Sequence, residues 1–218
     1  MIIPPPIVHI GLPKTGTTSL QRHLFPLLCQ ENGCLYNPAE YIRIHKQRLT
    51  YNDEDKERLQ KVVMQNSVLI SQEDLMDWNP RNWEIAADRV LDLFGKEAQI
   101  VITIRNPLDF LRSVYSQQIQ EGNVIRAEDF FLSSDEYDHM SSFLPARSML
   151  RYDYEKLDYN RLREIYENRF SNVYFAPLSK INNLFPFAQL LSLDSEQIGR
   201  YQRILESAPR ENKSYSQL

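Results

Sequence analysis

The stretch Ile7-Val-His-Ile-Gly-Leu-Pro-Lys-Thr-Gly-Thr-Thr-Ser19 decides the fold class of this chain. Its first part, residues 7–12, is an apolar run that predicts a buried strand. The run leads into a loop that contains Gly11 and Gly16, and a helix is predicted to begin at Thr17. A strand, a glycine-containing turn and a helix start direct several backbone N–H groups and the positive end of a helix dipole at one point. The stretch therefore predicts an anion-binding loop.

Strands and helices are predicted to alternate along the rest of the chain. Apolar runs predict further strands at 67–71, 99–104 and 173–176. Apolar spacing and capping residues predict helices at 17–33, 80–95, 107–122, 158–168 and 194–205. Alternation of this kind predicts a three-layer α/β fold, P-loop-like, with a mostly parallel central sheet and helices on both faces. We find no repeat or linker, so residues 1–218 are expected to form a single domain.

Composition excludes several classes of protein. The chain has 218 residues and a net charge of −4, which argues against a nucleic-acid or membrane-surface binder acting through bulk positive charge. Neither a signal peptide nor the roughly 20 consecutive apolar residues of a membrane span is recognisable. The expectation is a soluble, cytoplasmic protein. Its two cysteines, Cys29 and Cys34, are expected to be partly buried thiols.

The loop nearly matches the nucleotide P-loop G-x-x-x-x-G-K-[ST] but departs from it at the lysine. Gly11 and Gly16 have the correct spacing, yet Thr17 stands where the lysine should be, and the lysine is instead Lys14. A nucleoside triphosphate requires that lysine at its β- and γ-phosphates. The loop is therefore expected to bind a different phosphate-containing ligand.

Two motifs resemble those of the sulfotransferase family, in its bacterial form. Residues 13–19 look like the family loop that binds a 5′-phosphosulfate, and Arg105 at a strand end, with Ser113 eight residues later, resembles the second signature. The resemblance implies that the donor is 3′-phosphoadenosine-5′-phosphosulfate (PAPS) and that Arg105 and Ser113 bind its 3′-phosphate. Because Lys14 and Arg105 both follow parallel strands, the fold should bring them to one edge of the sheet. The donor-binding residues implied by the resemblance are Lys14, Thr15, Gly16, Thr17, Thr18, Ser19, Arg105 and Ser113.

The resemblance also implies in-line transfer of a sulfuryl group, without a metal, to a hydroxyl of a carbohydrate, lipid or small metabolite. Positioning and charge stabilisation should do most of the catalytic work, with Lys14 stabilising the leaving 5′-phosphate. The general base is the open question. Glu73, directly after the strand at 67–71, is the first candidate, and Glu40 and His45 are the alternatives.

Other regions and functions stay open at this point. Residues 117–157 correspond to the variable region of the family and are expected to contribute to the acceptor pocket. The family motif Arg-Lys-Gly is absent, and Arg210 or Lys213, in the segment 209–218, is a candidate to replace it. The alternative functions are a P-loop kinase or nucleotidase, with Glu73 or Asp74 near a Mg²⁺ ion, and a non-catalytic nucleotide-binding module. The expected partner is a hydroxyl-bearing acceptor and not a nucleic acid.

Overall fold

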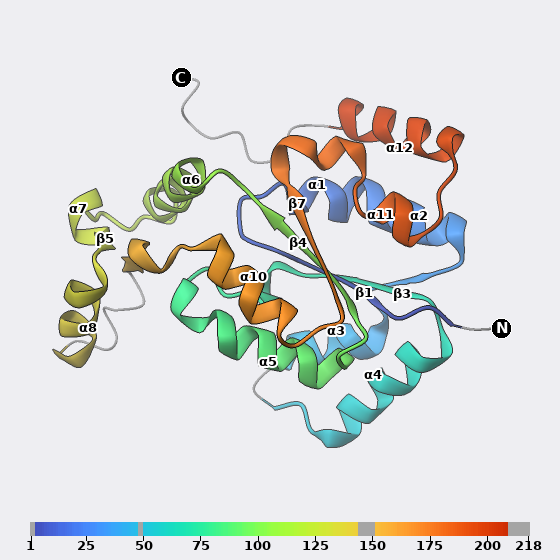
Figure 1. Cartoon of the computed structure of the whole chain (residues 1–218), viewed down its shortest axis with the longest axis horizontal. Coiled ribbons are helices and arrows are strands. Elements are labelled where there is room, and N and C mark those ends of the chain that lie inside the picture. Colours follow the sequence, from blue (N-terminus) through green and yellow to red (C-terminus); the bar gives the residue numbers. More distant parts are fainter. Residues whose placement is uncertain (1–2, 48–49, 144–150, 209–218) are drawn as a thin grey trace.

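The computed structural model describes residues 3–47, 50–143 and 151–208. At its centre lies a five-stranded parallel sheet with the strand order β2-β3-β1-β4-β7 (Figure 1). The strands are β1 (Ile7–Gly11), β2 (Leu35–Tyr36), β3 (Val68–Ser71), β4 (Gln99–Ile104) and β7 (Asn172–Pro177). The strands predicted from apolar runs are all present, and the two-residue strand β2 is added at one edge.

The central strand β1 separates two hydrophobic cores. Val8 pairs with Ile70 of β3 on one side and with Ile100 of β4 on the other. Successive side chains of a strand point to opposite faces of the sheet. Val8 accordingly belongs to one core and Ile7 to the other. A strand buried on both faces explains why this segment is an apolar run rather than an alternating pattern.

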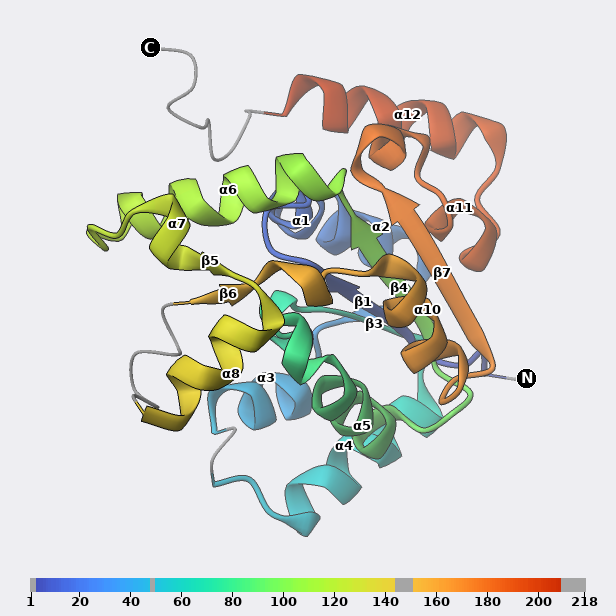
Figure 2. The same cartoon turned by 60° about the vertical axis from the view of Figure 1, so that its left-hand side comes forward.

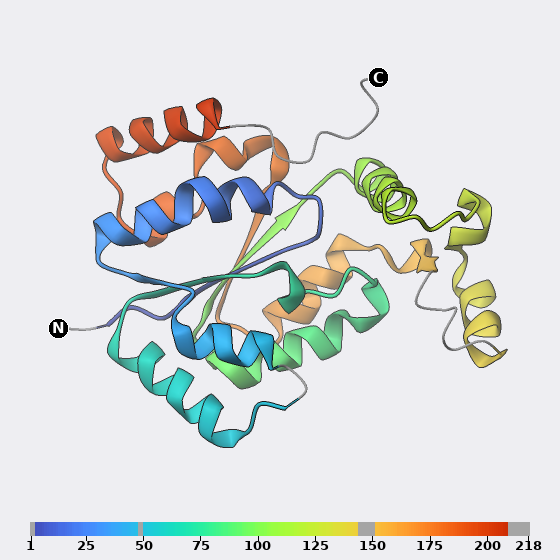
Figure 3. The same cartoon turned by 180° about the vertical axis from the view of Figure 1, so that it is seen from behind.

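Helices cover both faces of the sheet, as predicted. One face is covered by α1 (Thr17–Ser19), a π-helical turn (Leu20–Leu24), α2 (Phe25–Asn32), α11 (Phe187–Leu190) and α12 (Ser195–Ser207). The other face is covered by α3 (Ala39–Lys46), α4 (Asp53–Gln65), α5 (Trp83–Phe94) and α10 (Tyr159–Glu167) (Figure 3). The protein thus has the predicted three-layer α/β architecture. No helix within the described ranges combines the length and the apolar character that a membrane crossing requires.

A smaller lobe extends beyond one end of the sheet (Figure 2). It contains α6 (Pro107–Gln120), α7 (Ala127–Phe130), β5 (Phe131–Leu132), α8 (Ser134–Phe143) and β6 (Tyr152–Asp153), with β5 and β6 forming a second, two-stranded sheet. The lobe is fastened to the main body by Arg81, which donates to the fully buried carboxylate of Asp153 over 2.6 Å. Arg81 lies three residues after Trp78, so the attachment also holds the segment that contains Trp78.

The helix predicted over 17–33 differs from the expectation in its interior. It is interrupted by the π-helical turn, and Pro26 lies in the first turn of α2, where a missing N–H costs nothing. It ends at Gly33, whose φ of 65° is left-handed. The expectation of two free thiols is wrong: Cys29 and Cys34 form a disulfide. The turn at Gly33 reverses the chain and brings the two Cα atoms to 4.6 Å.

Candidate functional site

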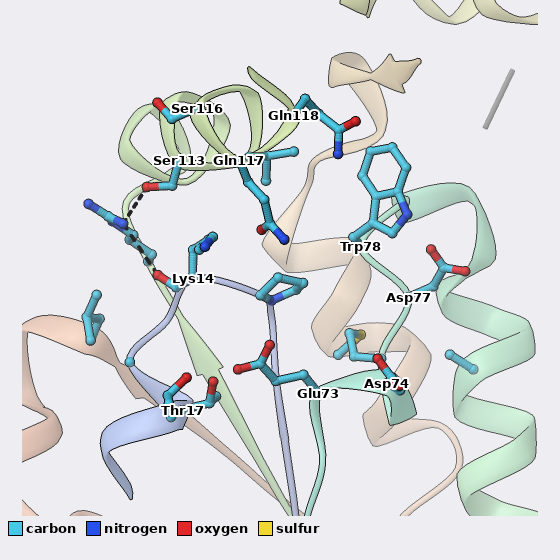
Figure 4. Close-up of a pocket in the computed structure, with 18 of the residues that line it drawn as sticks. Lys14, Thr17, Glu73, Asp74, Asp77, Trp78, Ser113, Ser116, Gln117 and Gln118 are labelled. Carbon is cyan, nitrogen blue, oxygen red and sulfur yellow. Dashed lines mark hydrogen bonds between the residues drawn. The ribbon is translucent and has the colours of Figure 1, made fainter. Parts of the chain in front are cut away.

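A cleft of 1190 Å³ opens at the carboxyl edge of the central sheet (Figure 4). The strands β1, β3 and β4 end there, and the residues that follow them include Lys14, Glu73 and Arg105, all of which line the cleft. Parallel strands place their carboxyl ends on the same side, so three segments far apart in the sequence meet at one cleft. The structure therefore brings together the three charged residues that the sequence singled out after strand ends.

The loop between β1 and α1 has a backbone that only certain residues tolerate. Lys14 and Gly16 both have left-handed φ values, of 64° and 77°. A Cβ atom added to Gly11 would lie 2.3 Å from Thr103 Oγ1 and 2.3 Å from Thr17 Cγ2. Glycine is required at position 11 because the loop folds tightly over the end of β4. This tight turn leads the chain directly into the first helical turn at the cleft.

The hydroxyl groups of the loop serve two different purposes. Thr15 is buried, and its Oγ1 donates to Leu12 O over 2.5 Å and forms a 2.7 Å hydrogen bond with Thr103 Oγ1. Thr15 does not line the cleft, whereas residues 16–19 do. The side chain of Thr15 thus supports the loop, and the residues that follow it present polar groups to the cleft.

Arg105 and Ser113, the two residues of the second motif, lie side by side at the cleft. Arg105 Nη1 donates to Ser113 Oγ over 2.5 Å and to Lys14 O over 3.4 Å. Tyr159 OH holds the same strand end by donating to Arg105 O over 2.8 Å. Among the residues that the structure describes, no carboxylate forms an ion pair with Lys14 or with Arg105. Two cations at one cleft that form no ion pair with the described residues favour a site for an anionic ligand.

Glu73 lies in the 3₁₀ turn Glu73–Leu75, and its side chain points into the cleft (Figure 4). Burial raises the pKa of the Glu73 carboxyl, the nearby charge of Lys14 lowers it in part, and the charge of Asp74 raises it further. A carboxylate with a raised pKa holds a proton more readily than an ordinary one. Glu73 is therefore suited to proton transfer with a ligand bound beside Lys14.

The two alternatives to Glu73 lie elsewhere. Glu40 and His45 are on α3, and neither side chain lines the cleft. The ring of His45 instead stacks on Tyr41, with 6.2 Å between the ring centroids. The structure thus separates these two residues from the charged groups that Glu73 faces.

His9 of β1 and Ser71 of β3 form a buried polar pair near the carboxyl ends of these two strands. His9 Nδ1 lies 2.7 Å from Ser71 Oγ, and Gln21 Nε2 donates to the same oxygen over 3.1 Å. Burial lowers the pKa of His9 to about 3, so the imidazole is neutral at physiological pH. The pair connects β1 to β3 directly before the loops that carry Lys14 and Glu73. His9 is thus a supporting residue of the core and not a group that faces the ligand.

The cleft has a second wall, of which the sequence analysis identified only the part that lies in the predicted acceptor region 117–157. Its side chains include Asp77 and Trp78, from the segment before α5, and Gln117 and Gln118, from α6. In the sequence, the spacing of Ser113, Ser116, Gln117 and Gln120 places polar groups on one face of α6 (Pro107–Gln120).

The region predicted to contribute to the acceptor pocket, 117–157, contributes chiefly its first residues to the cleft. Gln117, Gln118, Gln120 and Glu121 line it, whereas the aromatic residues Phe130 and Tyr152 are buried in the core. The candidates Arg210 and Lys213 lie outside the described residues. Within the described residues, no group of three or more His, Cys, Asp or Glu side chains is arranged to hold a metal ion.

Comparison with known proteins shows the fold. No family model matches the sequence, and no curated protein matches it. Among solved structures, a sulfotransferase from Alicyclobacillus acidocaldarius superposes with a TM-score of 0.50 and 18% identity, over 89% of this chain and 81% of that one. A gluconokinase from Sinorhizobium meliloti gives a TM-score of 0.33 at 12% identity, over 95% of this chain and 100% of that one. The first likeness shows a sulfotransferase-like α/β fold.

Proposed function

We propose that this protein is a sulfotransferase that uses PAPS as its donor and a hydroxyl-bearing molecule as its acceptor. The observation that carries this proposal is the pair of cations, Lys14 and Arg105, that lack a carboxylate partner among the described residues and line the same cleft. PAPS has anionic groups at both its 5′ and its 3′ positions, so its chemistry suits both cations.

The residues present fit such a donor. The backbone N–H groups and hydroxyls of residues 16–19 would hold the 5′-phosphate at the start of the helix. Arg105 offers a planar guanidinium and Ser113 a hydroxyl, which together would hold the 3′-phosphate. Lys14 would oppose the negative charge that grows on the 5′-phosphate oxygen during transfer. Thr15 has no direct contact in this scheme, because its hydroxyl is used inside the loop.

PAPS supplies an electrophilic sulfuryl group when it is bound. In the proposed reaction a bond forms between the acceptor oxygen and sulfur, and the bond between sulfur and the 5′-phosphate oxygen breaks. Glu73 accepts the proton that the acceptor hydroxyl loses. The products are a sulfate ester and 3′-phosphoadenosine-5′-phosphate (PAP). The raised pKa of Glu73 favours this step because it strengthens the carboxylate as a base.

No observation favours the kinase or nucleotidase alternative. The position after Gly16, where a P-loop has its lysine, is taken by Thr17, which carries no charge. The likeness to the gluconokinase is too weak to support that reading.

Calorimetry with PAP tests donor binding. We expect saturable binding by the wild type and about 10- to 100-fold weaker binding by Arg105→Ala, because charged hydrogen bonds to a phosphate are lost. Arg112→Ala is the matched control, since Arg112 lies on α6, the helix that follows Arg105, is 80% exposed and does not line the cleft. Its affinity for PAP should equal that of the wild type. Binding of Mg²⁺-ATP in preference to PAP would contradict the proposal.

Transfer from ³⁵S-labelled PAPS to a panel of hydroxyl-bearing acceptors tests the reaction itself. We expect label in an acid-labile sulfate ester and release of PAP in equal amount. Tight PAP binding without transfer to any acceptor would instead identify a non-catalytic nucleotide-binding module.

A further inference from the structure

The wall of the cleft that lies away from Arg105 has a chemistry of its own. We call it the acceptor wall and define it by Asp77, Trp78, Gln117 and Gln118 (Figure 4). These side chains come from two segments, the turn before α5 and the C-terminal half of α6. Figure 4 shows Glu73 with Lys14 on one side and Asp77 and Trp78 on the other.

Trp78 supplies a flat and fixed surface to the acceptor wall. Its ring packs against Tyr152, with centroids 5.6 Å apart, and is nearly parallel to Phe130 at 6.3 Å. Both of these partners are buried in the core, whereas Trp78 is half-buried and lines the cleft. An indole held in this way offers a platform on which a ligand ring with an apolar face can stack.

The amides of the acceptor wall offer both donors and acceptors to a ligand. Gln117 Nε2 donates to Glu121, and Gln118 Oε1 accepts from Asn123 Nδ2 over 2.9 Å. Within the described part of the chain, Gln117 Oε1 and Gln118 Nε2 have no partner. One free acceptor and one free donor match a hydroxyl group, which can both donate and accept.

The charge near the acceptor wall disfavours an anionic acceptor. Of the described residues that line the cleft beside this wall, Asp77 and Glu121 are acidic and Arg89 is basic. The Asp77 carboxylate accepts from Asn79 N over 2.8 Å and from Asn82 Nδ2 over 2.9 Å, so it is fixed by neutral groups. A uronic acid or an already sulfated sugar would be repelled there.

The apolar surface is too small for a lipid or sterol. Beside Trp78, the apolar side chains of this part of the cleft are Met76, Ile85, Ala86 and Val114. Of these four, Ile85 alone is well exposed, at 62%. One aromatic plane surrounded by amides and carboxylates therefore fits a polyhydroxylated ring better than a continuous hydrocarbon.

We propose that the acceptor is a neutral carbohydrate whose sugar ring stacks on Trp78 and whose hydroxyls bond to Gln117 and Gln118. This inference rests on the proposed sulfotransferase function, since it assigns the opposite wall to PAPS. One hydroxyl of the bound sugar is directed toward Glu73, which lies between the two walls.

Tryptophan fluorescence of the intact chain, saturated with PAP, gives a direct test. The chain contains two tryptophans, Trp78 and Trp83. Because Trp83 is fully buried, its emission should stay constant, so a change in emission reports on Trp78. Titration with neutral mono- and disaccharides should give a saturable change with at least one sugar. The same titration with a soluble sterol and a sulfated disaccharide should give none.

Variants of Trp78 test whether sugar binding at the acceptor wall is needed for sulfuryl transfer. Trp78→Ala should raise the KM for the sugar about tenfold in the ³⁵S assay, and Trp78→Phe should restore most of the loss because a ring is kept. PAP affinity should be unchanged in both. Met64→Ala on α4, which alters an exposed residue outside the cleft, is the control. If Trp78→Ala does not fold, Gln118→Ala takes its place and should also raise the sugar KM.

The outcomes separate the two proposals. If PAP binds but sulfate is transferred only to phenols, sterols or anionic sugars, the carbohydrate inference is wrong and the sulfotransferase function stands. A sugar KM that is unchanged in Trp78→Ala, or in Gln118→Ala, also overturns the inference. If PAP does not bind, the sulfotransferase function fails, and the fluorescence titration alone decides whether the wall binds neutral sugars.

Discussion

The two walls of the cleft are built on different principles. The wall around Lys14 and Arg105 is formed where strands end, and we call it the phosphate wall because it is the proposed site of the PAPS phosphates. Much of it is backbone held in a shape that Gly11 and Gly16 permit. The acceptor wall is formed by side chains on a turn and a helix, with Trp78 at its centre. The proposed donor always presents the same phosphates, so a rigid backbone can bind it. Acceptors differ from one another, so they are better bound by side chains, which can be substituted without a change in the backbone.

The walls also differ in what supports them. The loop 12–16 rests on the central sheet through the hydrogen bond between Thr15 and Thr103. Trp78 rests on the lobe, through Tyr152 and Phe130, and Arg81 ties that lobe to the main body through Asp153. Changes to the packing of Tyr152 and Phe130 under Trp78 should therefore alter acceptor binding more than donor binding.

The largest effect is expected at Glu73, between the walls. Glu73→Gln removes the proton acceptor and should lower kcat by roughly 10²- to 10⁴-fold, measured by ³⁵S transfer, with PAP affinity retained. Glu40→Gln and His45→Gln are the controls, because these residues do not line the cleft. Loss of transfer in either control, together with activity in Glu73→Gln, would assign the base to α3 instead.

The raised pKa of Glu73 also predicts a pH dependence with a definite sign. The base acts deprotonated, so kcat/KM should fall as pH drops through the pKa of Glu73, and this limb should lie above the ordinary value of 4.5. Burial favours the protonated form in the folded state, so the charged carboxylate lowers stability at neutral pH and this penalty disappears as pH falls. Glu73→Gln should therefore match or exceed the wild-type Tm at pH 7, measured by thermal unfolding. A clear fall in Tm would show that the charge is stabilising.

The next effect is expected at Lys14, in the phosphate wall. Lys14→Ala should lower kcat by roughly 10²- to 10³-fold in the ³⁵S assay, because the charge opposing the leaving phosphate is lost. Alanine is strained at a φ of 64°, so Lys14→Asn serves as the matched variant, since asparagine tolerates this conformation. Both variants should be equally inactive. Activity retained in Lys14→Asn would mean that backbone shape, and not charge, carries the effect.

The smallest effect on activity is expected at Thr15. Thr15→Val keeps the shape of the side chain but removes both hydrogen bonds of the hydroxyl and leaves Thr103 without this partner. The free energy of unfolding should fall by about 1–3 kcal/mol in urea titrations. At a temperature where the variant is folded, PAP affinity should change little. A large loss of PAP affinity without loss of stability would place the hydroxyl against the donor.

Much of the phosphate wall could be predicted from the sequence because its signals are local. The apolar run at 7–10, the glycines and the pair Arg105 and Ser113 each lie within one strand-turn-helix unit. The sequence could not distinguish Thr15 from its neighbours, since the burial of its side chain depends on Thr103, far along the chain. The disulfide was missed for a similar reason, because it depends on how the chain turns at Gly33.

What the sequence alone determined is therefore the three-layer α/β fold and the position of the strand-turn-helix loop proposed to bind an anion, since both follow from the order of short local patterns. What only the tertiary structure decided is which side chains share the cleft. Glu73 was one of three candidates until the strand ends placed it beside Lys14 and left Glu40 and His45 on α3. Trp78 carried no signal at all, because its role depends on the buried rings of a lobe that the sequence did not predict. Local patterns fix the backbone, but the surroundings of a side chain are set by contacts between distant segments.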